Sequence, residues 1–590
     1  MNIDALIDIV KKHEIDAVHP GYGFLSESAE FAKRMWNEAS AVVVGPGWEI
    51  LEATGDKLKA RELAERCNVP VSPALLTPTS SHEEITDFAS RVGYPIIVKA
   101  VDGGAGRGIR LIRDPSTLIS SVKRAVEESP SKKLFAEKAA VDGFRHIEVQ
   151  IVGDGRRNVT HLWERECSIQ RRYQKVIEIA PSTISDRTLI TQVIEDAIRM
   201  AKSIKYFSLG TFEFLLNPTS GTYYFLEINP RLQVEHTITE SLTTIDIVKA
   251  QLLLAQGAGL SDCGLPAATR DPKTPPPVQS IQLRITAENT ENDWTLSIGK
   301  ITDFDFPTGN GIRIDTHLTH ATPTIISADF DSLIAKLIIT APSWKACVKK
   351  AQRALSDTRI HGVKTSLPML RAIVAHPDYL NGACDTQWLE SHQPELIAQS
   401  RRLSSQPANF PDTLGSASTP SLASANTLLR KGDAWSLALT PSTPNTTEKE
   451  QPQTHHLEII RILRNEFPVA LSADILFTAP SHPQTAYTVH LSSTTASAAA
   501  TTAAHRRADP SDASHVGIPF AGKLVEVLVD EGDAVKEGDV VCVVQQMKME
   551  LEVRSPRSGV VTWVLEVDEG EDVGEGTLAA VVERDREARL

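Results

Sequence analysis

The stretch TYYFLEINPRLQVEH, residues 222–236, carries a polar side chain at every second position from residue 227 onward. In an extended chain, this period of two predicts one polar face and one apolar face that packs into a core. Pro230 removes one donor from a strand ladder, so we expect the strand to end or bend near it. The polar positions are Glu227, Asn229, Arg231, Gln233 and Glu235.

An upstream strand-like run, GTFEFL at 210–215, adds the carboxylate of Glu213. Two carboxylates and an amide oxygen are hard ligands of the kind that Mg²⁺ takes, with phosphate oxygens completing its coordination shell. The polar face therefore indicates a metal site beside a phosphate-bearing substrate. A solvated edge strand with a polar outer face is the alternative that this segment leaves open.

A glycine-rich segment, DGGAGRG at 102–108, lies shortly after the apolar strand PIIV and Lys99. Glycines allow backbone N–H groups to approach phosphate oxygens closely. A strand rather than a helix is expected after this segment, which argues against a dinucleotide-binding fingerprint. The segment is thus a candidate phosphate-binding loop.

The wider chain divides by composition. Residues 1–400 alternate strand-like runs with segments of helical spacing, which predicts an α/β body. Strands are expected at 41–44, 96–98 and 212–216, and helices at 49–67 and 189–205. After Ser400 the chain becomes rich in Ser, Thr, Pro and Asn, which is typical of a linker. A β-rich island follows, with strand candidates at 457–462, 469–478 and 486–491, and then a Thr/Ala/Ser-rich tether up to residue 514.

The last 70 or so residues form an internal repeat. PFAG at 519–522 matches PRSG at 556–559, and DEGD at 530–533 matches DEGE at 568–571. Each half alternates apolar and polar residues and places glycines at turns, which predicts two hairpin-rich halves that close into a flattened barrel. QQMKME, at 545–550, lies between the halves, at the exposed tip.

Composition excludes several classes of protein. The 590 residues include 61 basic and 75 acidic side chains, a net charge of −14, and are 41% hydrophobic. The absence of any run of basic residues argues against nucleic-acid or anionic-membrane partners, and no apolar stretch is long enough for a membrane helix. The six scattered cysteines form no C-x-x-C pair, which favours a reducing intracellular compartment.

The terminal module resembles the biotinyl carrier domain. In that family the Lys of M-K-M carries biotin as an amide, which implies that Lys548 is the attachment site. The related lipoyl domain usually has D-K-A at this point, so Met547 and Met549 favour biotin.

The body resembles the ATP-grasp fold and, more narrowly, the biotin carboxylase component of biotin-dependent carboxylases. The segments that carry this resemblance, besides those above, are HPGYGFLSE at 19–27, GDK at 55–57, EK at 137–138, FDSLIAK at 330–336 and HGVKT at 361–365. Together they span nearly all of residues 1–390. Tyr173 and Thr244 depart from the family, which often has His and usually Gly at these two positions.

The resemblance implies a role for each matched residue. The ATP-binding residues would be Lys57, Lys99, Gly103, Gly104, Gly106, Gly108, Glu137, Lys138, His146 and Gln170. The ligands of Mg²⁺ or Mn²⁺ would be Glu213, Glu227 and Asn229. The bicarbonate-binding residues would be Lys175, Arg231, Gln233, Val234 and Glu235, with Glu235 taking the proton. Arg313 would stabilise the enolate form of biotin, which makes Glu235, Arg231, Lys175 and Arg313 the catalytic set.

The expected fold is thus a multidomain α/β protein, with an ATP-grasp biotin carboxylase body, a small β-rich middle domain and a C-terminal biotinyl domain. The expected boundaries are 1–50 for an incomplete N-terminal subdomain, 51–255 for the ATP-grasp domain, 256–400 for the carboxylase C-terminal domain, 401–455 for a linker, 456–492 for a subunit-joining-like domain, 493–514 for a tether and 515–585 for the biotinyl domain. Family members begin some tens of residues earlier, so we expect the N-terminus to be truncated. That leaves open whether the protein is mitochondrial or cytoplasmic.

The expected activity is ATP-dependent carboxylation of protein-bound biotin with bicarbonate, as the first half-reaction of an acetyl-, propionyl- or methylcrotonyl-CoA carboxylase. The expected partners are a separate carboxyltransferase β-type subunit and biotin protein ligase, in an oligomer. A non-catalytic biotin carrier with a disabled body is the alternative. Another ATP-grasp carboxylate–amine ligase is a third reading, which leaves the M-K-M module unexplained.

Overall fold

The computed structural model describes residues 2–583 except 101–108, 128, 130, 266–269, 321–323, 328–329, 406–433, 440–452, 467–469, 480–481, 493–505, 510–511, 521, 547–548, 566–570 and 575. Lys548 and the four predicted loop glycines, Gly103, Gly104, Gly106 and Gly108, therefore lie outside the described residues.

The N-terminal unit alternates helices and short strands. Its elements are α1 (Ile3–Lys12), β1 (Ala17–Val18), α2 (Ala29–Ala39) and β2 (Val42–Val43). β1 and β2 pair in parallel, and the helices bury Ile7 and Met35 between them. The side chains of Asn2 and Ser28 accept backbone N–H groups and so cap the two helices.

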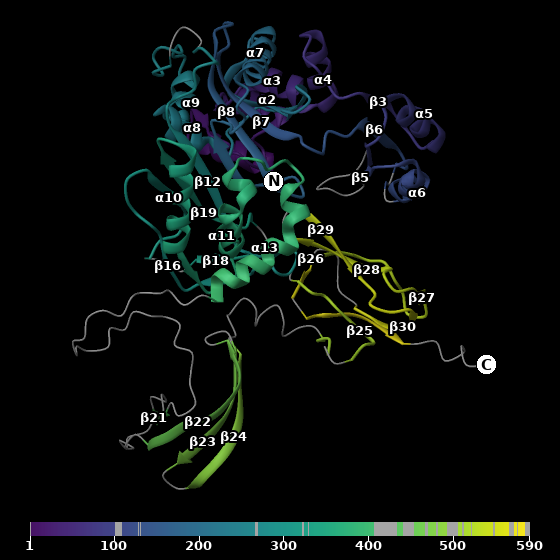
Figure 1. Ribbon diagram of the computed structural model, residues 1–590, viewed down its shortest axis with the longest axis vertical. Coiled ribbons are helices and arrows are strands. Elements are labelled where there is room, and N and C mark those ends of the chain that lie inside the picture. Colours follow the sequence, from purple (N-terminus) through teal and green to yellow (C-terminus); the bar gives the residue numbers. More distant parts are fainter. Residues whose placement is uncertain are drawn as a thin grey trace.

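A small lobe follows, joined to the N-terminal unit by α3 (Trp48–Gly55) and α4 (Lys57–Arg66). It pairs four strands in the order β3 (Ala74–Thr79), β6 (Leu134–Lys138), β4 (Ile96–Ala100) and β5 (Ile109–Ile112). α5 (His82–Val92) and α6 (Leu118–Glu127) complete its core, and the lobe projects to one side of the body (Figure 1). β5 confirms the expectation that a strand follows the glycine-rich segment.

An eight-stranded sheet forms the centre of the body. Its order is β11 (Thr222–Asn229), β10 (Phe207–Asn217), β7 (Arg145–Asp154), β8 (Val159–Arg171), β9 (Gln174–Ala180), β12 (Gln279–Thr286), β19 (Leu333–Ala341) and β17 (Ile312–Thr316). α7 (Arg187–Ser203) and α10 (Trp344–Asp357) pack their apolar residues against alternate positions of the strands, such as Val149 and Leu337. α8 (His236–Thr243) packs against the other face, at Ile338. The remaining positions of that second face are largely polar.

The alternation predicted for residues 222–236 is correct only as far as the strand continues. β11 ends at Asn229, so the predicted end near Pro230 is confirmed, whereas residues 231–235 form turns instead of an extended face. A bulge between β10 and β11 also shifts the register after Glu213, and Leu226, an apolar residue of this alternation, is 41% exposed. The extra residue of a bulge changes the face on which a side chain lies, and composition does not reveal it.

The middle domain is a four-stranded antiparallel sheet of β21 (Ala434–Leu439), β22 (Gln453–Glu466), β23 (Ala470–Ala479) and β24 (His482–Ser492). The three predicted strands coincide with β22, β23 and β24. β21 lies within the segment predicted as linker, 401–455, and α13 (Trp388–Ser405) also runs into that segment. The linker prediction is therefore wrong for these residues. β21 lacks a signal of its own and is ordered by its pairing with β22.

The C-terminal module consists of two four-stranded sheets around one core of valines. The first sheet pairs β25 (His515–Gly517), β32 (Leu578–Glu583), β30 (Gly559–Val564) and β27 (Ala534–Val535). The second pairs β29 (Met549–Arg554), β28 (Val540–Gln546), β26 (Gly522–Val527) and β31 (Asp572–Val573). The repeat places Gly522 and Gly559 at equivalent positions, where an added Cβ would lie 2.5 Å from Gln545 O and 2.0 Å from Glu583 O. Glycine is required at both positions because the backbones approach so closely.

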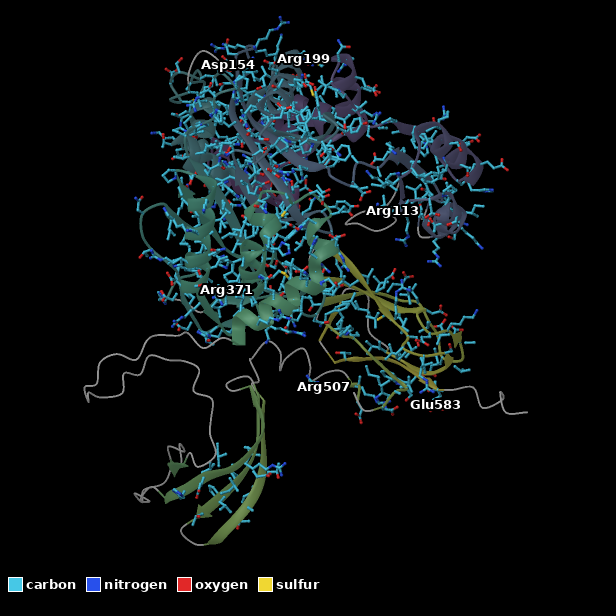
Figure 2. All side chains as sticks on the ribbon, in the orientation of Figure 1. Arg113, Asp154, Arg199, Arg371, Arg507 and Glu583 are labelled. Carbon is cyan, nitrogen blue, oxygen red and sulfur yellow. The ribbon has the colours of Figure 1, made fainter. Side chains whose placement is uncertain are left out.

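This module begins earlier than predicted. The amide of Leu578 donates to Arg506 O at 2.8 Å, and the amide of Ala508 donates to Gly576 O at 2.9 Å. The Arg506 guanidinium lies 5.3 Å from the centre of the Trp563 ring, and Arg507 is labelled beside the module in Figure 2. The end of the predicted tether, 493–514, is therefore part of the folded domain. In the described part of the chain, no helix is long and apolar enough to cross a membrane.

Candidate active site

A row of charged side chains crosses the α8 face of the central sheet. Strand register places Glu227, Glu213 and Glu148 opposite one another on β11, β10 and β7, and Glu148 opposite Arg165 on β8. At the other end of the sheet, Arg284, Lys336 and Asp315 are opposite one another on β12, β19 and β17. The row links two regions that lie far apart in the sequence.

Lys175, on β9, lies at the centre of this row. Its Nζ forms ion pairs with Glu148, with Glu213 Oε1 at 3.3 Å and with Glu235 Oε1 at 2.7 Å. Burial by itself favours the neutral amine, but the three carboxylates hold the pKa of Lys175 well above its usual value. Lys175 is therefore charged.

Glu235 immediately precedes α8 and is buried. Its second oxygen, Oε2, accepts a hydrogen bond from Arg284 Nη2 at 2.9 Å. Burial disfavours the carboxylate, yet the charges of Lys175 and Arg284, with Arg165 nearby, lower the pKa of Glu235 well below its usual value. The side chain is thus an ionised carboxylate held between two cations.

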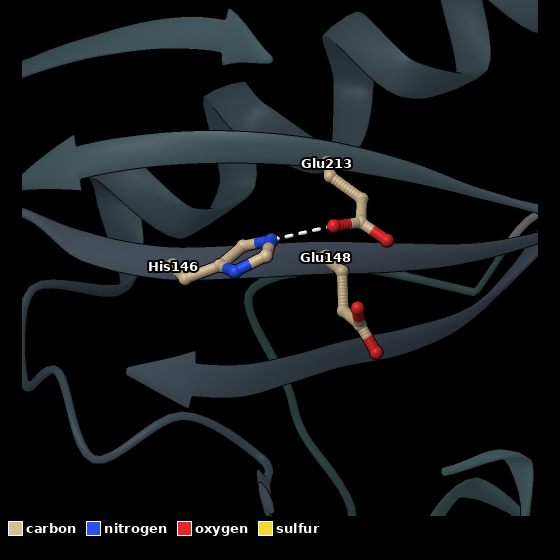
Figure 3. A group of neighbouring side chains, drawn as sticks. All are labelled: His146, Glu148 and Glu213. Atoms are coloured by element: carbon tan, nitrogen blue, oxygen red, sulfur yellow. Dashed lines mark hydrogen bonds and ion pairs between the residues drawn. The ribbon is translucent and has the colours of Figure 1, made fainter. Parts of the chain in front are cut away.

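Glu213 is held in the same way at the β10 end of the row. His146 Nε2 lies 2.6 Å from Glu213 Oε2 (Figure 3). Asn229 Nδ2 donates to Glu213 Oε1 at 2.5 Å. Burial opposes ionisation, but Lys175 and His146 lower the pKa of Glu213. Glu213 is an ionised ligand candidate with Glu227 opposite it on β11.

The donor set of Glu213, Glu227 and Asn229 suits Mg²⁺, since carboxylate and amide oxygens are the ligands this ion takes. His146, Glu148 and Glu213 also place one ligand atom each within 4.8 Å of one another. However, the Glu148 carboxylate lies between Arg165 and Lys175, whose positive charges oppose a cation at that position. The chemistry of the residues therefore fits a metal better on the β10–β11 side.

Two residues after β11 present donors suited to an anion. Gln233 is 6% exposed, and its Nε2 is buried without a hydrogen-bond partner among the described residues. An unsatisfied buried donor is costly, which points to a ligand that satisfies it. Arg231 forms an ion pair with Glu27, which lies in the segment 19–27 of the N-terminal unit.

The remaining predicted residues lie on β17 and in the small lobe. Arg313, on β17, holds Asp315 through Nε–Oδ1 at 2.8 Å and Nη2–Oδ2 at 3.0 Å, and Glu240 of α8 through Nη1 at 2.8 Å. Lys99 on β4 forms an ion pair with Glu137 on β6. Lys138 donates to the backbone oxygens of Gly93 and Tyr94, and burial lowers the pKa of Lys138.

The predicted site residues are thus only partly connected to one another. Hydrogen bonds and ion pairs connect His146, Asn229, Glu213, Lys175 and Glu235. Lys57 begins α4, and Gln170 is buried at the end of β8. Lys99, Glu137 and Lys138 lie in the small lobe, apart from the row.

Sequence reasoning missed the charged residues that hold the centre. These are Glu148, Arg165, Glu178 and Arg284, with Glu178 paired to Arg284. A signal was present, because RHIEVQI at 145–151 and IQLRI at 281–285 place polar or charged residues at alternate positions between apolar ones. Charges at alternate positions of such strands indicate one polar sheet face.

Family models match four parts of the chain. They are the biotin carboxylase N-terminal domain at 1–51, the carbamoyl-phosphate synthase L chain ATP-binding domain at 56–263, the biotin carboxylase C-terminal domain at 282–391 and the biotin-requiring enzyme domain at 514–582. An ATP-binding carboxylase body combined with a biotinyl module defines the class of biotin-dependent enzymes.

Pyruvate carboxylases are among the relatives of this chain. Pyruvate carboxylase from Aspergillus niger is 42% identical over 400 residues, and that from Bacillus subtilis is 40% identical over 409, each alignment covering 67% of this chain. This chain covers only about a third of the length of these proteins, 33% and 34%.

Solved structures of biotin-dependent carboxylases are also similar to this chain. The biotin carboxylase domain of Hydrogenobacter thermophilus 2-oxoglutarate carboxylase, in complex with MgADP and bicarbonate, is 37% identical with a TM-score of 0.61, covering 67% of this chain and 85% of that one. Biotin carboxylase from Campylobacter jejuni is 35% identical with a TM-score of 0.60, covering 66% and 85%. A single-chain long-chain acyl-CoA carboxylase is 28% identical with a TM-score of 0.58, covering 100% of this chain and 45% of that one.

The chain belongs to the biotin carboxylase family of biotin-dependent carboxylases. Its homologues are ligases that use ATP and form carbon–nitrogen bonds, and the matches support biotin, ATP and Mg²⁺ as cofactors.

Proposed function

We propose that this chain carboxylates biotin, attached to its own Lys548, with bicarbonate at the expense of ATP. The observation that carries the proposal is the pair of Lys175 and ionised Glu235. Two residues before Glu235 lies Gln233, whose Nε2 has no hydrogen-bond partner among the residues that the structure describes. This arrangement offers an anion one positive charge, one free donor and one base.

Residues 231–235, which we name the bicarbonate loop, would bind bicarbonate together with Lys175. Arg231 and Lys175 supply positive charge, and Gln233 supplies its amide donor. Val234 contributes backbone to the loop. Since bicarbonate must attack a polyanion, these cations would offset the charge that accumulates in the transition state.

Glu235 would accept the proton of bicarbonate. A base must be deprotonated before it acts, and Lys175 and Arg284 keep Glu235 in that form. The same cations reduce its affinity for a proton. Bicarbonate that draws Lys175 towards itself would therefore increase the basicity of Glu235 at the moment of reaction.

The nucleotide would lie between the small lobe and the central sheet. Glu213, Glu227 and Asn229 would hold Mg²⁺ or Mn²⁺, which supplies charge neutralisation at the phosphates when bound. Lys57, Lys99 and His146 would contact phosphates, and the loop with Gly103, Gly104, Gly106 and Gly108 would cover them. Glu137 and Lys138 would contact the base, with Gln170 beside the nucleotide. Arg313 would stabilise the ureido group of biotin.

We propose an acyl-CoA as the final acceptor, in a reaction completed by a carboxyltransferase on a separate subunit. A long-chain acyl-CoA carboxylase matches 100% of this chain, middle sheet included, whereas the alignment with Aspergillus niger pyruvate carboxylase covers 67%. That acyl-CoA carboxylase is a single chain. We place the transferase outside residues 1–590, because the span between body and biotinyl module is too short for a transferase-sized domain.

The test uses the purified, biotinylated chain with ATP, Mg²⁺ and bicarbonate. We expect ADP release that depends on bicarbonate, and incorporation of labelled carbon at Lys548. A chain that is biotinylated yet releases no ADP under these conditions would support the carrier-only alternative. Addition of candidate carboxyltransferase subunits with acetyl-, propionyl- or methylcrotonyl-CoA, against pyruvate, would then identify the acceptor.

A further inference from the structure

Lys336 is buried in the middle of β19, between charged residues on both neighbouring strands. It lies opposite Arg284 on β12 and opposite Asp315 on β17, and is 9% exposed. Burial lowers the pKa of Lys336, although the carboxylate of Asp315 acts in the opposite direction. Replacement of a buried ion pair by apolar residues of similar volume is often neutral or stabilising, so packing alone does not explain a lysine at this position.

The ammonium group of Lys336 joins two elements that the proposed reaction uses. Its Nζ donates to Val234 O at 3.2 Å and forms an ion pair with Asp315 Oδ2 at 3.3 Å. Val234 lies between Gln233 and Glu235, so the first of these bonds holds the backbone of the bicarbonate loop.

The ion pair with Asp315 connects Lys336 to Arg313 and, through α8, to the bicarbonate loop. Asp315 forms two hydrogen bonds with Arg313, and Arg313 Nη1 donates to Glu240 Oε2 at 2.8 Å. Glu240 belongs to α8, which begins at His236, the residue directly after the loop. The contacts therefore form a closed circuit from the loop through β19 and β17 to α8.

We propose that Lys336 is a positioning residue that holds the bicarbonate loop and Arg313 at a fixed separation. The carbon that bicarbonate supplies at the loop can then reach the biotin at Arg313. This inference rests on the proposed function. Lys336 itself touches neither substrate, and its role would be to keep ATP use and biotin carboxylation coupled.

The test compares Lys336→Met with the parent in the full, biotinylated chain. Methionine has a similar length but removes the hydrogen bond to Val234 O and the ion pair between Lys336 and Asp315. We expect the labelled carbon incorporated at Lys548 per ADP released to fall about 10-fold, the lower end of what loss of a hydrogen bond to a charged group produces. We also expect amide hydrogen exchange of residues 232–243 to become about 10-fold faster.

Lys350→Met is the matched control. Lys350 Nζ also donates to two backbone oxygens, Asn310 O at 2.9 Å and Thr340 O at 3.0 Å, at the other end of the β17–β19 pair. This variant should leave both the ratio and the exchange of residues 232–243 as in the parent. An unchanged ratio in Lys336→Met, or a fall of equal size in Lys350→Met, would overturn the proposal.

The exchange measurement separates this inference from the proposed function. If the parent releases no ADP, the proposed function fails. Unchanged amide hydrogen exchange of residues 232–243 in Lys336→Met instead refutes the connection between Lys336 and the bicarbonate loop. If Lys336→Met does not fold, Asp315→Asn tests the other arm of the circuit. It should lower the ratio while the exchange of residues 232–235 stays near the parent value, and an unchanged ratio would again refute the role.

Discussion

At the scale of single residues, the site depends on how charges are balanced in a buried layer. Lys175 contacts three carboxylates, and Glu235 contacts two cations, so each group is held in its ionised form by its neighbours. Buried charges are costly unless they are paired, and removal of one partner leaves the other uncompensated. Substitutions here should therefore affect chemistry and stability together.

The variant Glu235→Gln separates the effect on chemistry from the effect on stability. The amide retains the size and a hydrogen-bond acceptor but cannot take a proton, so we expect bicarbonate-dependent ADP release to fall about 100-fold or more. Nucleotide binding, measured by calorimetry, should stay near the parent value. Glu164→Gln is the control, since Glu164 is equally buried and pairs with Arg187 away from the proposed bicarbonate loop. Equal losses in both variants would contradict a specific role for Glu235.

Thr244 is strained by its backbone. It ends α8 with φ 60°, in the left-handed region that a β-branched residue rarely adopts. We expect Thr244→Gly to raise the free energy of unfolding by about 1 kcal/mol, because glycine adopts this conformation without a steric penalty. Thr244→Ala keeps the Cβ and should gain less, as urea titration would reveal. If alanine stabilises as much as glycine, strain is not the cause.

At the scale of elements, the C-terminal repeat depends on close contacts between strands. Gly559 begins β30, where an added Cβ would lie 2.0 Å from Glu583 O. The equivalent Gly522 has the same restriction against Gln545 O. The repeated glycines therefore mark where the two halves of the module approach each other.

We expect Gly559→Ala to destabilise the C-terminal module by about 2 kcal/mol or more, since the strands must separate to admit the methyl group. Thr562→Ala, at an exposed position of the same strand, should cost a few tenths of a kcal/mol. Thermal unfolding of the full chain, followed by the fluorescence of Trp563 in a variant without the other tryptophans, reports on this module. Equal stability of the two variants would contradict the close approach.

At the scale of the whole molecule, the charged row ties the body together across the central sheet. It runs from β11 to β17 and so brings residues from 146 to 336 into one layer. The stability of the body should therefore depend on the ionisation of this layer.

The direction in which the stability of the body changes with pH follows from the directions of the pKa shifts. Glu213 and Glu235 have lowered pKa values, so their contribution is present above the usual value of 4.5 and is lost as pH falls through the folded values. Lys175 has a raised pKa, so its contribution is present below 10.5 and is lost as pH rises through the folded value. Glu178, with a raised pKa, acts in the opposite direction on the acid side.

We therefore expect the free energy of unfolding of the body to decrease below about pH 4.5 and to be less sensitive to acid in Glu235→Gln. Urea titrations between about pH 7 and about pH 3 test this. Parallel curves for parent and variant would contradict the assigned ionisation of Glu235.

Much of the molecule could be predicted from local patterns. The glycine-rich segment with a following strand, the three strands of the middle domain and the repeat of the terminal module each depend on residues that are near one another in the sequence. Strand β21 and the segment at Arg506 escaped prediction because each is ordered by pairing with another strand, β22 and β32 respectively.

The identity of the chain as a biotin carboxylase family member was therefore determined by its sequence alone, because motifs such as M-K-M and the alternation up to Asn229 are local properties. Only the tertiary structure decided that Arg165, Arg284 and Glu148 surround Lys175 and Glu235, since strand order and register bring these residues together. A bulge, a turn after Pro230 and the pairing of strands far apart in the chain are set by packing, which no short segment encodes.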